Sequence, residues 1–169
     1  MMKSIRLVVT ILLAASVANL SLMIPGGNIE TREFTEYSPI VLACFNIFLT
    51  SLGFGSLAVC YFVYKQDKWY VISAILGAAY MAVYLLDLGH IFPVSLNPMP
   101  PTLAKLEWIG LVLGGTLTAA AILALHGRKQ ESVSFQKPKL PLMVKIILTI
   151  LAALIVIYAT ISAMGHHPL

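Results

Sequence analysis

The stretch Trp69–His90, WYVISAILGAAYMAVYLLDLGH, decides the fold class of this chain. It is long enough to cross the hydrocarbon core of a bilayer, and it is apolar on every side but one. On that side, small or polar residues follow one another at spacings of three and four, which places them on a single helical face. They are Ser73, Gly77, Tyr80, Tyr84 and Asp87. The pattern predicts a membrane-spanning helix whose polar face ends in a carboxylate.

The composition extends this prediction to the whole chain. Of its 169 residues, 59% are hydrophobic and 11% are charged, whereas soluble domains carry roughly 25% charged residues. Several runs exceed the ~18 apolar residues that mark a membrane-spanning helix. We therefore expect one all-α domain over residues 1–169, a polytopic transmembrane helix bundle with five spans. The predicted spans are about 5–24, 39–64, 69–89, 103–125 and 142–164.

The first run has an alternative interpretation as a cleaved signal peptide. Ser16-Val17-Ala18 supplies the small residues of a cleavage site, which such peptides require. The apolar run continues past this site to Ile24, and this continuation favours an uncleaved span. Cleavage would leave the orientation of the other four spans unchanged.

The basic residues indicate the orientation of the bundle. Nine of the eleven lysines and arginines lie at the N-terminal end, between the second and third spans, or in the segment that joins the fourth span to the fifth and the first turn of the fifth span. Arg32 and Lys105 lie on the other side. Because basic residues accumulate on the cytoplasmic side, we expect the N-terminus in the cytoplasm and the C-terminus outside a cell membrane. The basic residues form short caps between apolar runs, so we expect the lipid bilayer as partner, and no nucleic acid.

Polar side chains gather in the half of the spans that this orientation places outside. Such side chains usually face the protein interior. We therefore predict a polar pocket in the outer half of the bundle, roofed by the acidic loop 29–38 and the proline-rich segment 90–101. The candidate residues are Asn19, Asn46, Tyr80, Tyr84, Asp87, His90, Glu107 and Tyr158. The alternative is that these side chains only hydrogen-bond neighbouring helices.

Asp87 has two candidate partners among the charged residues. With Glu107 it would form a carboxyl pair suited to proton transfer. With Lys105 it would form a plain ion pair at the membrane edge, and nothing in the sequence chooses between them.

Histidines are the candidate metal ligands, although we expect no metal site. His90 lies one helical turn after Asp87, and His166 and His167 fall on the same predicted side. Imidazole and carboxylate groups suit zinc, copper or iron, but a terminal histidine pair is more simply explained as solvated. The spans lack the facing histidines that would hold a haem, and the sequence leaves any other cofactor unknown.

Gly110 and Gly114 form a GxxxG pair in the fourth span. Such a pair lets another helix approach closely, so this face predicts self-association or membership of a larger membrane complex.

The sequence contains no HExxH, GxSxG, phosphate-binding glycine loop or CxxC motif, which are common signatures of enzymes. We therefore expect a non-enzymatic ligand-binding protein or accessory subunit. One alternative is an outward-facing enzyme acting on a lipidic or quinone-like substrate through Asp87, His90 or Glu107. A second is a small transporter, although internal repeats and paired charges inside the membrane would then be expected.

Overall fold

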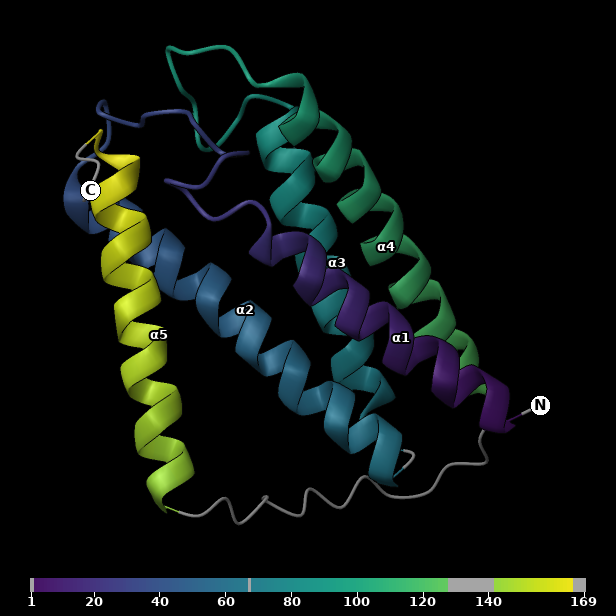
Figure 1. Cartoon of the computed structure of the whole chain (residues 1–169). Helices are drawn as coiled ribbons and strands as arrows, with labels where there is room; N and C mark the ends of the chain where they lie inside the picture. The colour runs from purple at the N-terminus through teal and green to yellow at the C-terminus, as the bar shows by residue number, and fades with distance from the viewer. Residues whose placement is uncertain (1, 67, 128–141, 166–169) are drawn as a thin grey trace.

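The computed structural model describes residues 2–66, 68–127 and 142–165, and these residues form an all-helical bundle (Figure 1). The helices are α1 (Met2–Ser21), α2 (Pro39–Gln66), α3 (Tyr70–Leu88), α4 (Pro101–His126) and α5 (Leu142–Ala163). Each of the five is long and apolar enough to cross a membrane. The prediction of a multi-pass transmembrane bundle with five spans is therefore confirmed.

Proline and glycine set several of the helix ends. Pro39 is the first residue of α2 and Pro101 the first of α4, positions where the missing backbone N–H costs nothing. Gly89 and Gly127 follow α3 and α4, and their backbone N–H groups donate to the carbonyls of Leu85 and Leu123. α1 ends at Ser21, three residues before the predicted end.

Small residues bring α3 and α4 into close contact. A Cβ atom added to Gly77 would lie 2.8 Å from the carbonyl oxygen of Gly114, and one added to Gly114 would lie 2.9 Å from the carbonyl oxygen of Gly77. A Cβ atom on Gly110 would meet the Tyr84 ring and the Asn19 amide. The glycine face for which the sequence predicts association therefore packs inside this chain, against α3 and α1.

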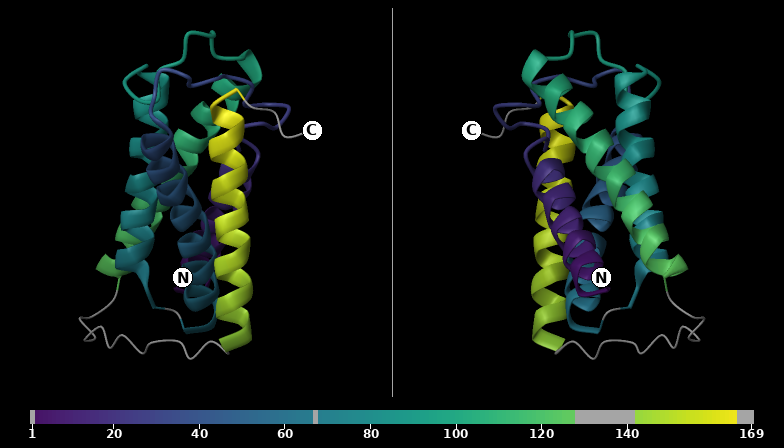
Figure 2. Two further views of the ribbon diagram at one scale, coloured as in Figure 1. Left: turned by 90° about the vertical axis from the view of Figure 1, so that its left-hand side faces the viewer. Right: turned by 90° about the vertical axis from the view of Figure 1, so that its right-hand side faces the viewer.

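The two ends of the bundle differ in polarity. Near the N-terminus of α1, a buried apolar cluster fills the space between the helices; it consists of Val9, Leu13, Val59, Val63, Tyr70, Leu117 and Ala124. At the opposite end lie the segments 22–38 and 89–100 (Figure 2). We call this the loop end.

The two segments at the loop end are held to each other and to α5. The Phe34 amide donates to the Ala163 carbonyl over 2.7 Å. The Ser95 hydroxyl donates to the Glu33 carbonyl over 2.8 Å, and the Val94 amide donates to the Tyr37 hydroxyl over 3.0 Å. These contacts cover the loop end of the bundle.

Candidate functional site

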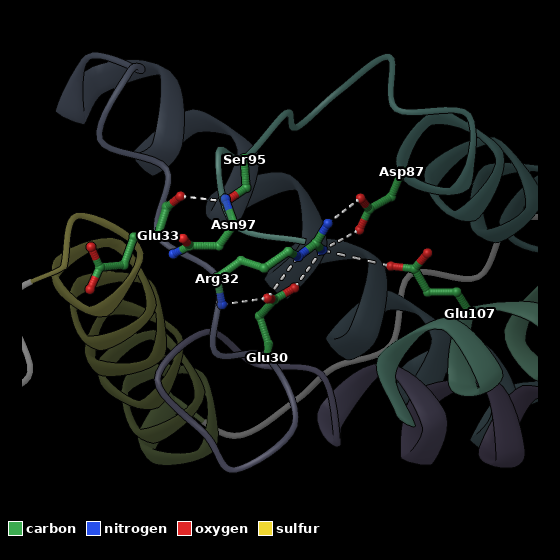
Figure 3. Close-up of polar contacts among 7 residues, drawn as sticks. All are labelled: Glu30, Arg32, Glu33, Asp87, Ser95, Asn97 and Glu107. Carbon is green, nitrogen blue, oxygen red and sulfur yellow. Dashed lines mark hydrogen bonds and ion pairs between the residues drawn. The ribbon is translucent and has the colours of Figure 1, made fainter. Parts of the chain in front are cut away.

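The guanidinium of Arg32 lies at the centre of a buried group of charges at the loop end (Figure 3). It donates to both carboxylate oxygens of Asp87, over 2.8 and 2.7 Å. It also donates to both carboxylate oxygens of Glu30, over 3.0 and 2.6 Å. A third carboxyl group, that of Glu107, has Oε1 3.9 Å from Nη2 of Arg32. We call these four residues the Arg32 cluster.

Three separate parts of the chain supply the Arg32 cluster. Asp87 stands in the last turn of α3, and Glu107 stands near the start of α4. Glu30 and Arg32 come from the segment 22–38, which turns inward because Glu30 also accepts the backbone N–H of Arg32 over 3.0 Å. Gly26 adopts a φ of +86°, a conformation that favours glycine, and its amide donates to the Glu30 carbonyl over 3.3 Å.

The cluster is buried and acidic on balance. The side chains of Arg32, Glu30 and Glu107 are 3%, 6% and 3% exposed. Burial alone lowers the pKa of the Arg32 guanidinium, but hydrogen bonds to Asp87 and Glu30, together with their charges, outweigh burial and raise that pKa above its ordinary value. Arg32 therefore stays charged at every physiological pH, and its one positive charge faces three carboxyl groups.

One carboxyl oxygen of the Arg32 cluster makes no hydrogen bond to the described residues. Within the described residues, Oε2 of Glu107 is buried and has no hydrogen-bond partner. A cavity of about 60 Å³ lies against the cluster, with all four of its residues in the wall. Buried polar groups are normally satisfied, so the arrangement suits a hydrogen-bond donor placed in this cavity.

A larger apolar cleft adjoins this cavity. It has a volume of about 280 Å³ and lies between α1, α2 and α5. The residues that line both spaces are Leu20, Met23, Pro25, Asn46 and Leu49. The site thus has a charged part and an apolar part that lie side by side and share five lining residues.

Four of the eight candidate residues line the 60 Å³ cavity: Asn46, Tyr84, Asp87 and Glu107. Asn19 stands behind Tyr84 and donates to its hydroxyl over 3.3 Å and to the Leu106 carbonyl over 3.1 Å. Asn46 donates to the Thr160 hydroxyl over 3.1 Å, which joins α2 to α5.

The remaining three candidates lie elsewhere. The Tyr80 hydroxyl donates to the Ser56 hydroxyl over 3.1 Å, and neither residue lines the cavity. His90 is exposed, with a φ of +52°. Tyr158 is 42% exposed and donates to the Gly26 carbonyl over 3.1 Å.

The metal candidates are not brought together in the described part of the chain. His166 and His167 lie outside the described residues. Among the residues that are described, no group of three histidine, cysteine, aspartate or glutamate side chains could hold a metal ion.

Two members of the Arg32 cluster were not among the sequence candidates. From the sequence, Glu30 and Arg32 are expected only as part of the acidic loop that roofs the pocket, whereas the structure buries both side chains and pairs Asp87 with Arg32. Lys105, the partner considered for Asp87, is exposed. One signal was available: Arg32 is a basic residue on the side where basic residues are scarce, which points to a specific partner.

Comparison with known proteins places the chain in a family. Residues 5–136 match the family described as a domain of unknown function, DUF8051. The match covers more than half of the chain, which therefore belongs to this family. The matched residues include nearly all of α1 to α4 and the entire Arg32 cluster, while α5 lies beyond them. No curated protein and no solved structure matches the chain.

Proposed function

We propose that this member of the DUF8051 family is a non-enzymatic, ligand-binding protein of the cell membrane, acting alone or as the ligand-binding subunit of a larger assembly. The observation that carries the proposal is Oε2 of Glu107, a buried acceptor without a partner in the described residues, beside a cavity. Leaving such a group unsatisfied costs about 1–3 kcal/mol, and more when it is charged. A ligand that donates a hydrogen bond there removes that cost.

The orientation that we propose puts the start of α1 in the cytoplasm and the loop end outside. It is supported by the nine of eleven basic residues that fall on the other side of the bundle in the sequence, as the positive-inside bias requires. The Arg32 cluster then lies in the outer half of the membrane.

The alternatives receive less support from the geometry. In an enzyme that uses Asp87, His90 or Glu107, the reacting groups should face the cavity. Both oxygens of Asp87 are held by Arg32, and His90 is exposed. In a transporter, a polar path should continue through the bundle, whereas the opposite half is filled by the apolar cluster near the N-terminus of α1.

Native mass spectrometry of the purified protein tests the proposal. The wild type is compared with Glu107→Gln, which weakens the acceptor, and with Glu36→Gln, which changes an exposed acid of the same loop. We expect a non-protein mass that wild type and Glu36→Gln retain and that Glu107→Gln binds about tenfold more weakly, as loss of about 1.4 kcal/mol implies. Equal occupancy in all three proteins, or no bound mass in any, would overturn the proposal.

A further inference from the structure

We infer that the ligand is a single-chain amphiphile with a protonated amine as its head group, and that it enters sideways from the bilayer between α1 and α5. The inference rests on the proposed function and specifies the class of ligand. Its parts are the head group, the apolar chain and the route of entry.

The charges of the Arg32 cluster select the head group. Three carboxyl groups face one guanidinium, and one oxygen of Glu107 remains unpartnered among the described residues. A protonated amine supplies both the missing positive charge and up to three hydrogen-bond donors. Charge-assisted hydrogen bonds of this kind are roughly twice as strong as neutral ones, so an amine fits this acceptor better than an alcohol does.

The same geometry disfavours an anionic head group. The Nε, Nη1 and Nη2 atoms of Arg32 each already donate to a carboxylate of Glu30 or Asp87. A phosphate or carboxylate would have to displace one of these partners and would meet the carboxylates of Glu30 and Asp87 as like charges. Like charges at close range are destabilising, and burial strengthens the effect.

The apolar cleft accommodates the chain of the amphiphile. Its wall is mostly apolar, with Ser21, Asn46 and Thr50 as its polar residues. Gly53 of α2 leaves room in it, since a Cβ atom there would lie 3.9 Å from the nearest neighbouring atom, Cδ2 of Leu20. The volume of about 280 Å³ is at the lower limit of roughly 300–1,000 Å³ for ligand pockets. It therefore suits one alkyl chain better than the two chains of a phospholipid.

The packing of the helices supplies the route of entry. Among the described helices, the backbone of α5 comes close to that of α2 alone; in Figure 1, α2 lies between α5 and α1. A further cavity of about 310 Å³ lies where α1 ends, between the start of the segment 22–38 and α5, and it shares Ser21, Ile24 and Ile155 with the apolar cleft. The site is covered at the loop end by segments that hydrogen bonds hold together, from Ser95 to Glu33 and from Phe34 to Ala163. A ligand would therefore enter from the side.

Thermal unfolding of the full chain in a neutral detergent tests this inference. The probes are dodecylamine, dodecanol, dodecanoate and ethylamine, each at the same free concentration and at neutral pH. We expect dodecylamine near saturation to raise the Tm by about 4 °C or more, because a bound ligand stabilises the native state. Dodecanol should produce a smaller shift, and dodecanoate and ethylamine essentially none.

Two matched variants locate the alkyl chain. Gly53→Leu fills the cleft, whereas Gly55→Leu makes the same change two residues away, where a Cβ atom meets nothing within 4 Å. We expect Gly53→Leu to lose the dodecylamine shift and Gly55→Leu to keep it. Leu151→Trp narrows the same cleft from α5 and serves as the test if Gly53→Leu does not fold. Glu107→Gln should remove the preference for the amine over the alcohol.

The outcomes separate this inference from the proposed function. Equal shifts with ethylamine and dodecylamine, unaffected by Gly53→Leu, would overturn the amphiphile while leaving a ligand site at the Arg32 cluster. A larger shift with dodecanoate than with dodecylamine would overturn the amine head group. No shift with any probe, together with no bound mass in native mass spectrometry, would overturn both.

Discussion

Arg32 is the single residue on which the charged site depends. Its guanidinium holds Glu30 and Asp87 with two hydrogen bonds each, and all three groups are buried. The planar fork of arginine matches two carboxylates at once, which the compact ammonium of lysine does not. Removing one partner from such a group leaves charges buried without compensation, and that is far more costly than the net value of the pair.

We therefore predict that Arg32→Met lowers the free energy of unfolding by about 3–5 kcal/mol. The control is Lys105→Met, which removes an exposed basic residue near the same end of the bundle and should change stability by less than about 1 kcal/mol. Reversible unfolding in bicelles measures both. Equal losses in the two variants would contradict the buried pairing.

A rescue experiment separates lost pairing from lost packing. Adding Glu30→Gln and Asp87→Asn to Arg32→Met removes the two carboxylates that Arg32 neutralises. We expect the triple variant to be more stable than Arg32→Met alone, because the uncompensated buried charges are gone. A triple variant that is less stable than the single one would show that Arg32 acts through packing.

At this scale the sequence predicts part of the site. Asp87 and Glu107 could be identified because a carboxylate in a span is costly and helical periodicity gives its direction. Glu30 and Arg32 could not, because no periodicity fixes the path of the segment 22–38. For Tyr158, as for Asp87, the position in a span predicts a side chain that faces the protein interior. Among the described helices, however, α5 packs against α2 alone, and Tyr158 is 42% exposed.

Among the described helices, α3 and α4 make the most extensive contact, and backbone proximity at Gly77 and Gly114 makes it possible. Packing of this kind holds membrane helices together in the absence of a hydrophobic driving force. It also fixes the relative position of Asp87 and Glu107, one from each helix.

Adjacent glycines on α4 allow a matched test of this contact. A methyl group at Gly114 would lie 2.9 Å from the Gly77 carbonyl oxygen, whereas one at Gly115 would lie 3.7 Å from Sδ of Met81, an ordinary contact. We predict that Gly114→Ala destabilises the protein by about 1–3 kcal/mol through overpacking and that Gly115→Ala does not. Unfolding in bicelles measures the difference. If Gly115→Ala lost as much as Gly114→Ala, the close contact would be wrong.

The elements themselves could be predicted almost completely from the sequence. A long apolar run inside a membrane has few options besides a helix, because every backbone polar group must be satisfied internally. The partner of each helix could not be predicted. The glycines at 110 and 114 indicated a close approach, but the pattern does not distinguish a neighbour in the same chain from one in another chain, and the structure places them against α3 and α1.

The molecule as a whole is asymmetric along the helix axes. Apolar side chains fill the end near the start of α1, and the Arg32 cluster lies beneath the covered loop end. Laterally it is asymmetric as well, because α5 packs against α2 and the segment 22–38, while the other four helices form the main bundle. The apolar cleft is a consequence of this separate position of α5.

The orientation in the membrane is a prediction at this scale. In a variant with Cys44→Ala and Cys60→Ala, which removes both native thiols, we predict that Asn97→Cys reacts with a membrane-impermeant maleimide in intact cells. Lys68→Cys, at the opposite end of α3, should react only after permeabilisation. Both positions are exposed. The reverse labelling pattern would place the loop end in the cytoplasm.

The most direct test of the central claim, that the Arg32 cluster and the apolar cleft form one ligand site, is an experimental structure of the protein in lipid nanodiscs. We predict elongated non-protein density in the cleft between α1, α2 and α5, ending within hydrogen-bonding distance of Oε2 of Glu107. A structure in which α5 closes onto α1, the cleft is absent and Glu107 is paired with a protein donor would contradict the claim.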